Sequence, residues 1–454
     1  MGCFIRLTHE RYARALAPWL GSTVTAVFCD EPDPLGRNVS PQCRPWTPGL
    51  EKELGEVGLT LCDLPRLWLG EDARAREVRR RYDQLIARHL GRSFYQPLRD
   101  WCHAHGLQLT GHPQHADDIG LERYFDIPGQ DLVWRWVAPE DDLSLRGRES
   151  TQAACAFSAM LHQGARQNSS ECFGCCGPKG DQWAMNVDDL LFFINWLAVR
   201  GCCRFYPHAF LYAGDTPVRL NDRPPDVGPR NYWWPWFGQL AGCMSRLSAM
   251  LTDAVADVPV AILCDDTHLP YETAACLQRL HVPYCYLTAE QLAGAWIEEN
   301  GDLLLPHGVR HSHVIIEDEQ LEELPDVAQA LSRLPRVYRA WRTGPERTSR
   351  QVARDVPLPF TLEGGEDIRL LYRRHGSEWL LMLCNEGEGS WQGVVRVARP
   401  GRCVRLDPFT GETADQPLTP QGLPVSLEFR QLLCFVLDEA QAPETVAALP
   451  RQVT

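Results

Sequence analysis

Strand-like and helix-like segments alternate along the first 210 residues of this 454-residue chain. Five short apolar runs stand out, at residues 24–29, 107–111, 131–137, 168–171 and 202–207. Each run ends in or next to a polar or ionisable residue, and stretches with helical spacing of apolar residues separate the runs. This alternation constrains the fold strongly because it is typical of parallel βα units.

Polar residues at the ends of successive parallel strands predict a barrel whose one rim carries the chemistry. A Rossmann sheet would also alternate, but no Gly-x-Gly-x-x-Gly loop follows any of the five strands. We therefore expect a TIM-type (β/α) barrel over residues 1–230. A complete barrel has eight strands, so the five predicted here indicate a partial barrel.

The remainder of the chain divides into two further parts. After an aromatic-rich segment at residues 232–237, apolar runs at 258–263, 284–287 and 312–316 again alternate with helical stretches. They predict a small Rossmann-like α/β domain over residues 231–345. Short strands punctuated by Gly and Pro follow at 368–372, 379–384, 393–397, 403–406 and 432–437. They predict a C-terminal β-sandwich over residues 355–440.

The charge of the chain argues against polyanionic partners. It has 45 basic and 59 acidic residues, a formal net charge of -14, which repels phosphate backbones and anionic membrane surfaces. No apolar run reaches the roughly 18 residues that span a bilayer, and the N-terminal residues lack the pattern of a secretory signal. We expect a cytoplasmic protein that binds neither nucleic acid nor membrane.

Eighteen cysteines are present, and without an export signal they are expected to be free thiols rather than disulfides. Cys172, Cys175 and Cys176, followed by Cys202 and Cys203, could form a zinc or redox site. Only one Cys-x-x-Cys spacing occurs, however, and adjacent residues in a strand point to opposite faces. We predict no metal site here, and a cysteine-based metal or redox protein remains an alternative.

Two glutamates follow or end predicted strands and are the candidate catalytic residues. Glu31 comes after the run at 24–29, and Glu171 ends the run at 168–171. Glycosidic bonds are cleaved by a pair of Asp or Glu residues, one of which protonates the leaving oxygen while the other attacks the anomeric carbon or activates water. An ordinary turn is the alternative at Glu31, because Pro32 follows it.

Aromatic and hydrogen-bonding side chains accompany these carboxylates. Sugars have apolar faces ringed by hydroxyls, so their binding sites combine aromatic platforms with polar groups. The candidate substrate-binding residues are Asp30, His112, Trp134, Arg135, Tyr206 and His208. In a strand at 131–137, Trp134 and Trp136 share one face and Arg135 points inward. Packing of the indoles against outer helices, and a structural hydrogen bond for each histidine, are the alternatives.

Several short motifs resemble those of known enzymes. They are Val-Phe-x-Asp-Glu-Pro at 27–32, Leu-Thr-Gly-His at 109–112, an Ala- and Ser-rich helical segment at 150–166 and Ser-Glu-Cys-Phe-Gly at 170–174. Together they resemble the barrel-type alpha-L-rhamnosidases and, more distantly, the beta-galactosidase-like barrel clan. In similar enzymes a Rossmann-like domain and a terminal β-sandwich follow the barrel, so the resemblance covers nearly the whole chain.

The resemblance implies roles for the two glutamates. In the clan's pattern the acid/base glutamate follows strand four and the nucleophile follows strand seven, which assigns Glu31 and Glu171 and makes the five strands numbers four to eight. Asp30 stands where an Asn commonly precedes the acid/base residue. Rhamnosidases of this kind are inverting, so retention and inversion both stay open. The resemblance alone admits a calcium ion, and no other cofactor is expected.

The sequence thus predicts a glycoside hydrolase that acts on O-glycosyl bonds of a carbohydrate substrate. Glu31 would be the general acid, Glu171 the nucleophile or base, and His112, Arg135 and His208 would orient hydroxyl groups. A non-catalytic carbohydrate-binding remnant of such an enzyme is the alternative from another class. Association into a homo-oligomer is expected to accompany a partial barrel, because uncovered strand edges favour pairing with another chain.

Overall fold

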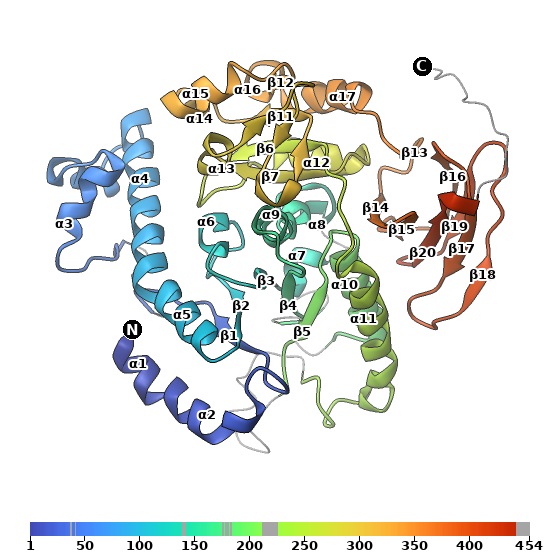
Figure 1. Cartoon of the computed structure of the whole chain (residues 1–454), viewed down its shortest axis with the longest axis horizontal. Helices are drawn as coiled ribbons and strands as arrows, with labels where there is room; N and C mark the ends of the chain where they lie inside the picture. The colour runs from blue at the N-terminus through green and yellow to red at the C-terminus, as the bar shows by residue number, and fades with distance from the viewer. Residues whose placement is uncertain are drawn as a thin grey trace. The chain divides into compact units, whose positions relative to one another are not determined.

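The computed structural model describes residues 1–36, 39–40, 42–138, 142–174, 177, 181, 184–210 and 226–441 (Figure 1). The chain forms two compact units. The first consists of Met1–Gln130 with Asp265–Leu269, and the second of Asp131–Cys264 with Pro270–Thr454.

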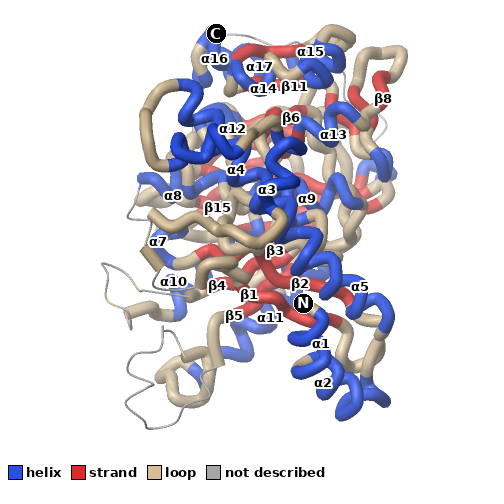
Figure 2. The backbone as a smooth tube through the Cα atoms, turned by 90° about the vertical axis from the view of Figure 1, so that its left-hand side faces the viewer, coloured by secondary structure: helices blue, strands red, loops and turns tan. Residues whose placement is uncertain are grey.

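The first unit is built on two parallel strands, β1 (Ala26–Asp30) and β2 (Gln108–His112), which lie side by side in Figure 2. Their register places Asp30 opposite His112. Apolar side chains of the helix that precedes β2 pack in one buried cluster with Leu109. The helices are α1 (Gly2–Leu7), α2 (His9–Leu16), α3 (Leu50–Glu53), α4 (Ala73–Leu90), α5 (Gln96–Ala104) and α6 (Ile119–Glu122). The two strands predicted in this region are confirmed.

The long helical stretch predicted from residue 72 to residue 105 is confirmed, together with its interruption near Gly91. Asp72 caps α4 by accepting a hydrogen bond from the Ala75 amide. A π-helical turn, Gly91–Tyr95, separates α4 from α5. The ring of Tyr124 packs so closely on Gly91 that a Cβ atom there would collide with it. Close approach of an aromatic ring therefore requires glycine at this break.

The second unit begins within β3 (Gly129–Leu132), which belongs to a three-stranded sheet of order β3-β4-β5. The other strands of this sheet, β4 (Ser169–Cys172) and β5 (Arg204–Pro207), pair in parallel. The helices of this part are α7 (Trp134–Val137), α8 (Asp142–Arg146), α9 (Ala154–Gln163), α10 (Val187–Ala198) and α11 (Phe237–Leu251). Helix α10 is buried over nearly its whole surface and begins with a capping box formed by Asn186 and Asp189.

The strand predicted over residues 131–137 is wrong beyond Leu132. The chain leaves β3 there and turns into the short helix α7. Trp134 and Val137, three residues apart, are both buried, while Arg135 is exposed. A helical turn buries both apolar residues on one side, whereas a strand would place them on opposite faces. Tertiary burial has overridden the strand-like composition.

Parallel pairing, as the alternation predicts, occurs between β1 and β2 and between β4 and β5. Within the described ranges the hydrogen bonds join β1 to β2, and β3 to β4 to β5, and these strands do not form a closed barrel.

A four-stranded parallel sheet follows, with strands β6 (Val260–Cys264), β7 (Tyr284–Thr288), β11 (His313–Ile316) and β12 (Val337–Arg339) in the order β12-β11-β6-β7. Every residue of β6, β7 and β11 is buried, as expected for parallel strands covered on both faces. The covering helices are α12 (Glu272–Arg279), α13 (Ala289–Ala293), α14 (Glu319–Glu322), α15 (Pro325–Leu331), α16 (Ala340–Thr343) and α17 (Pro345–Asp355). Alternate residues of the strands share an apolar cluster with α13, α14 and α15, while α12 and α17 pack together (Figure 1).

A small antiparallel sheet is inserted in this part of the second unit. It is formed by β8 (Trp296–Ile297), β9 (Leu303–Leu304) and β10 (Arg310–His311) in the order β10-β9-β8. His311 pairs with Leu303, and both are buried.

The C-terminal part is a β-sandwich of two antiparallel sheets. The strands are β13 (Phe360–Leu362), β14 (Ile368–His375), β15 (Glu378–Asn385), β16 (Trp391–Val397), β17 (Arg402–Leu406), β18 (Thr413–Asp415), β19 (Leu423–Leu427) and β20 (Leu432–Asp438). One sheet has the order β14-β15-β20-β17-β18 and the other β13-β16-β19. Side chains of both sheets, among them Tyr372, Trp379, Val395 and Leu427, form one apolar cluster.

A buried ion triad links the sandwich to the first part of the second unit. Arg200 Nη1 lies 2.6 Å from Glu386 Oε1, and Arg369 Nε lies 3.0 Å from Glu386 Oε2. None of the three side chains is more than 4% exposed. Arg200 also stacks on the Trp196 ring, 3.7 Å from the ring centroid. The triad satisfies a carboxylate that would otherwise be very costly to bury.

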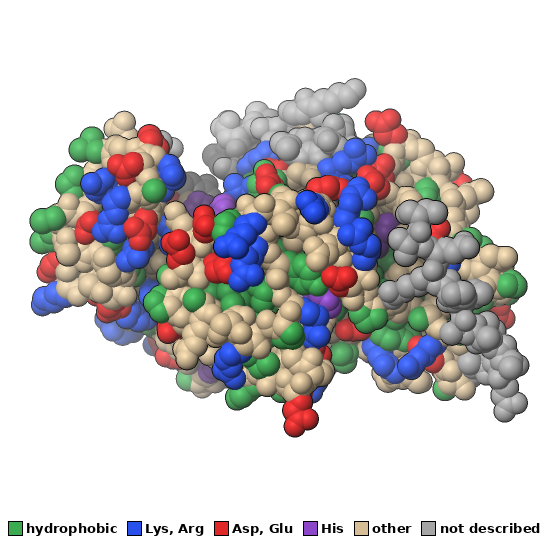
Figure 3. All heavy atoms as spheres, turned by 90° about the horizontal axis from the view of Figure 1, so that it is seen from above, with side chains coloured by type: hydrophobic (Ala, Val, Ile, Leu, Met, Phe, Trp, Pro, Cys, Tyr) green, Lys and Arg blue, Asp and Glu red, His purple; other side chains and the backbone are tan. Residues whose placement is uncertain are grey.

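The surface carries charges of both signs. Figure 3 shows Lys and Arg side chains interspersed with Asp and Glu side chains on the visible face. In the part of the chain that the structure describes, no helix combines the length and apolar character needed to cross a bilayer.

Replacing Glu386 by Ala is expected to lower the free energy of unfolding of the second unit by about 3–5 kcal/mol, because two buried guanidinium groups lose their shared counterion. Urea denaturation followed by circular dichroism measures the change. The matched control is Glu388→Ala, which removes an exposed carboxylate two residues away and is expected to change stability by less than about 0.5 kcal/mol. Equal stability of the two variants would contradict this role of the triad.

Candidate active site

Two of the predicted site residues form a pair at the ends of β1 and β2. Asp30 ends β1 and His112 ends β2, and His112 Nε2 lies 3.8 Å from Asp30 Oδ1. The imidazole is 1% exposed and the carboxylate 63% exposed. The ring of Phe28 meets the imidazole edge to face at 5.6 Å between centroids. The buried imidazole of His112 therefore lies next to the accessible carboxylate of Asp30.

Gly111 allows β2 to pack closely enough on β1 to place His112 beside Asp30. Its φ of +122° lies in the region that favours glycine. A Cβ atom at this position would collide with the carbonyl group of Cys29 on β1. The Leu-Thr-Gly-His motif therefore has a physical reason for its glycine next to the histidine.

Glu31 directly follows β1 and is partly buried. Its backbone has a positive φ of +39°, which is uncommon for a residue with a side chain. Such a conformation costs on the order of 1 kcal/mol or more, and residues of this kind cluster at functional sites. A positive φ also occurs in ordinary turns, so the backbone conformation is compatible with both interpretations of Glu31.

A cavity of about 440 Å³ lies in the first unit, beside the segments that follow β1 and β2. Pro32, Asp33 and Leu35 line it from the first segment, and His115 and Asp118 from the second. This size is within the range of small-molecule sites. The cavity has charged groups of both signs on its wall, since Arg44 and Asp83 contribute to it.

Asp118 is a candidate functional residue that the sequence did not reveal. Burial, reinforced by the negative charge of Asp117, raises the pKa of the Asp118 carboxyl to about 8. The group is therefore largely protonated at neutral pH and can donate a proton into the cavity that it lines. Its raised pKa depends on how the chain buries it, and the run Ala-Asp-Asp contains no local signal of that burial.

A second set of predicted residues meets in the second unit. Parallel pairing of β4 with β5 places Glu171 opposite Tyr206. The amide of His208 donates to the Cys172 carbonyl at 2.8 Å, which holds the histidine just past the end of β5. His208 Nδ1 is buried and has no hydrogen-bond partner among the described residues. A buried polar atom without a partner is what a ligand hydroxyl could satisfy.

Trp134 and Arg135 lie on α7 rather than on a strand. The Trp134 amide donates to the Gly174 carbonyl at 3.3 Å, so α7 begins beside the segment that follows β4. The Trp134 side chain is 2% exposed and lies 6.3 Å from the Phe193 ring. Arg135 is exposed, with its guanidinium 5.1 Å from the Trp136 ring centroid, so the expected inward direction of Arg135 in a strand does not apply.

The structure thus brings together Asp30, Glu31 and His112 in the first unit, and Glu171, Tyr206 and His208 in the second. Of the predicted cysteine cluster, Cys172, Cys202 and Cys203 are buried free thiols. Cys175 and Cys176 lie outside the described residues.

Comparison with known proteins shows which solved structures have a similar fold. No protein-family model and no curated protein matches the chain. Among solved structures, the chain is similar to a rhamnosidase from Novosphingobium sp. PP1Y, with 19% identity and a TM-score of 0.67 over 90% of this chain and 44% of that chain. It is also similar to the cold-adapted beta-galactosidase from Rahnella sp. R3, with 11% identity and a TM-score of 0.51 over 79% of this chain and 67% of that chain. Its fold resembles that of glycoside hydrolases.

At these identities the likeness concerns the fold. The predicted resemblance to glycoside hydrolases is confirmed at that level. The chain spans less than half of the length of the rhamnosidase that it matches.

The strand-end residues of the first unit do not fit a calcium ion. Calcium takes six to eight oxygen ligands, whereas the strand-end side chains here are the carboxylates of Asp30 and Glu31 and one imidazole. We therefore propose no step through calcium.

Replacing Asp118 by Asn is expected to flatten the pH dependence of stability. The carboxyl titrates near pH 8 in the folded state and near pH 4 when unfolded, so between these values the folded state holds a proton that unfolding releases. The free energy of unfolding of the wild type then falls as pH rises, by at most about 1.4 kcal/mol per pH unit from this group. Urea denaturation from pH 5 to pH 8 measures the slope.

The control for this series is Asp100→Asn, which removes an exposed carboxylate on α5. It is expected to keep the wild-type slope. An Asp118→Asn variant with the slope of the wild type would show that Asp118 is ionised throughout this range.

Proposed function

We propose that the protein is a glycoside hydrolase that cleaves an O-glycosyl bond with Glu31 as general acid and Glu171 as nucleophile or base. The observation that carries the proposal is the position of the two glutamates, each at the C-terminal end of a parallel strand in a fold that resembles glycoside hydrolases. In such folds the catalytic groups come from the ends of different strands.

The chemistry requires one carboxyl to protonate the leaving oxygen and another to attack the anomeric carbon or activate water. Glu31 follows the accessible Asp30 carboxylate and is available as the acid. Glu171 faces Tyr206 across the parallel pair β4–β5. The proposal requires both carboxyl groups to reach one glycosidic bond. About 5–5.5 Å between them would give retention of configuration, and about 6.5–9.5 Å inversion.

The remaining predicted residues supply hydroxyl recognition in this proposal. Asp30 and His112 would bind and orient hydroxyls at the ends of β1 and β2, and Tyr206 and His208 at the ends of β4 and β5. Arg135, exposed on α7, would reach a more distant hydroxyl. Trp134, packed against Phe193, would support this surface from below rather than stack on the sugar. The adjoining cavity, with Asp118 in its wall, would take one ring of the substrate.

Glu31→Gln and Glu171→Gln are each expected to lower kcat on a nitrophenyl glycoside by at least about 100-fold, because each removes a carboxyl group that takes part in bond cleavage. The substrate is first selected from a panel of nitrophenyl glycosides with the wild type. Release of nitrophenol measures the rate, and circular dichroism confirms the fold of each variant.

Glu51→Gln and Glu319→Gln serve as matched controls, because each removes an exposed carboxyl from a helix of one unit. Both are expected to keep wild-type kcat. Turnover within about threefold of the wild type in Glu31→Gln or Glu171→Gln removes that residue from the mechanism. Glycan binding by a wild type that hydrolyses none of the panel would instead favour the non-catalytic carbohydrate-binding alternative.

A further inference from the structure

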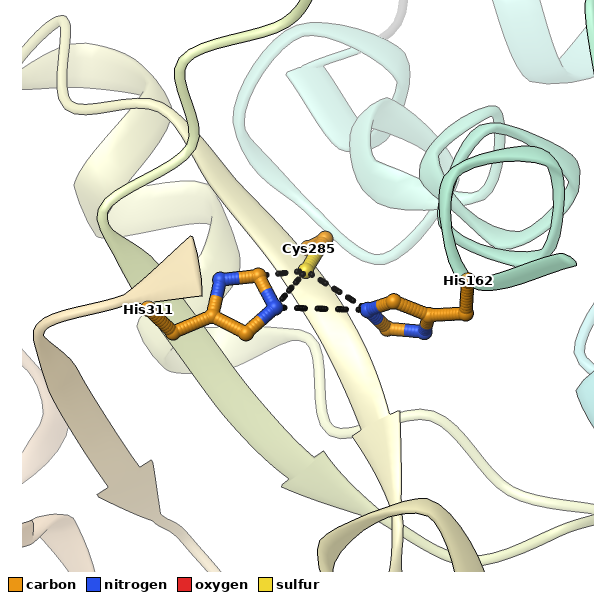
Figure 4. A group of neighbouring side chains, drawn as sticks. All are labelled: His162, Cys285 and His311. Atoms are coloured by element: carbon orange, nitrogen blue, oxygen red, sulfur yellow. Dashed lines mark hydrogen bonds between the residues drawn. The ribbon is translucent and has the colours of Figure 1, made fainter. Parts of the chain in front are cut away.

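A second group of ionisable side chains lies elsewhere in the second unit. His162 is on the last turn of α9, Cys285 is in β7 and His311 is in β10. Figure 4 shows the two imidazoles directed toward each other and toward the Cys285 sulfur. The three residues are 7%, 0% and 1% exposed, respectively. The proposed hydrolysis makes no use of them.

The three potential ligand atoms form a nearly regular triangle. His162 Nε2 lies 3.3 Å from His311 Nε2. Cys285 Sγ lies 3.5 Å from His162 Nε2 and 3.5 Å from His311 Nε2. The two rings are almost perpendicular, at 84°. Three donor atoms from three separate elements thus converge on one point.

These separations are the edges expected around a tetrahedral metal ion. Zinc bonds to imidazole nitrogen at about 2.0–2.1 Å and to thiolate sulfur at about 2.3 Å. Tetrahedral angles between such bonds place two nitrogens roughly 3.3–3.4 Å apart, and a nitrogen and a sulfur roughly 3.5–3.6 Å apart. The observed triangle has edges of these lengths. Because Cys285 Sγ also lies 4.0 Å from His311 Nδ1, ligation through His311 Nε2 requires a rotation of the imidazole relative to the thiol.

Hydrogen bonding alone satisfies the triangle less well. His311 Nδ1 donates to the Val258 carbonyl at 2.8 Å, so in the neutral ring Nε2 carries a lone pair and no proton. His162 Nε2 and Cys285 Sγ can each bring one proton at most. Two protons cannot form hydrogen bonds along three edges, whereas one cation accepts all three lone pairs. Ligating histidines typically have such a backbone carbonyl on the other ring nitrogen.

The frame around the triangle is firmly held. The Tyr286 amide donates to Ser158 Oγ at 2.9 Å, which joins β7 to α9 one turn before His162. At the end of α9, Gly164 packs so closely on the His307 ring that a Cβ atom would come within 2.6 Å of it. Helix, sheet and the loop before β10 are therefore fixed next to one another, which keeps the three potential ligands close together.

We propose that His162, Cys285 and His311 bind one borderline-soft divalent metal ion, with zinc as the favoured occupant. The fourth coordination position would be taken by a solvent molecule. Binding would convert the Cys285 thiol to a thiolate with release of its proton. The ion would fasten α9 to β7 and β10, and this role is independent of glycoside hydrolysis.

The states of the imidazoles are compatible with this site. Burial is the main cause that lowers the pKa of His162 to about 3 and that of His311 to about 4. Both rings are therefore neutral near pH 7, which is the form that ligates a metal.

The test is the metal content of the full-length chain purified without chelators, measured by inductively coupled plasma mass spectrometry. About one zinc ion per chain is expected in the wild type, and at least a tenfold lower content in Cys285→Ser and in His311→Ala. Cys434→Ser, which alters another buried free thiol in β20, is the matched control and is expected to keep the zinc. Retention of zinc by both site variants would overturn the assignment.

A second measurement on the wild type does not depend on the folding of variants. After removal of bound metal by a chelator and dialysis, Co²⁺ is added to the chain. The proposal predicts intense visible bands of tetrahedral cobalt and a thiolate-to-cobalt charge-transfer band, both of which saturate at about one equivalent and disappear on addition of zinc. Absence of these bands, together with no stoichiometric metal in the purified protein, would overturn the proposal and leave the hydrolase proposal unaffected.

Discussion

The buried carboxylate of Glu386 is the constraint on which the second unit depends. An isolated charge in that position would cost several kcal/mol, and two guanidinium groups held at 2.6 Å and 3.0 Å offset it. Arg200 also donates to the Ser150 carbonyl, and Arg369 to the Leu145 carbonyl. Residues near α8, the end of α10 and the sandwich therefore have to meet in one arrangement, because any other leaves buried charge without a partner.

The candidate site depends on a different constraint. Short parallel strands place particular side chains at their C-terminal ends. Glu171 is placed by pairing of β4 with β5, and the residue after β5 is held by a backbone hydrogen bond to β4. In the first unit β1 and β2 perform the same task for Asp30 and His112. In both units the sheet supplies rigid support, and the side chains at its edge are free to differ in chemistry.

Two kinds of ionisable group occur in the molecule, and burial separates them. Asp30, at a strand end, is mostly exposed, and Asp118 lines an open cavity, so both can meet a ligand from solvent. His162, Cys285 and His311, on a helix and two sheets, are buried and have little access to solvent. The first group is accessible to a ligand from solvent, whereas the second group is enclosed by protein.

Local sequence patterns predicted several helices and strands correctly. The strand-like runs before Glu31 and His112 became β1 and β2, and the break at Gly91 in a long helix was visible from the glycine itself. Such features depend on neighbours along the chain, namely side-chain period, caps and turn residues. The strand predicted through Trp134 is wrong because tertiary burial, and not neighbours along the chain, decided the conformation there. Burial of Trp134 and Val137 on one side selected a helical turn.

The sequence by itself determined the alternation of elements and the polar residues at strand ends, because both are written in short stretches of chain. Tertiary structure alone decided the protonation of Asp118, the partners of Glu386 and the convergence of His162 with Cys285, which are 123 residues apart. Each of these depends on desolvation and on distances between distant segments. No local pattern encodes such distances, so they emerge only when the chain packs.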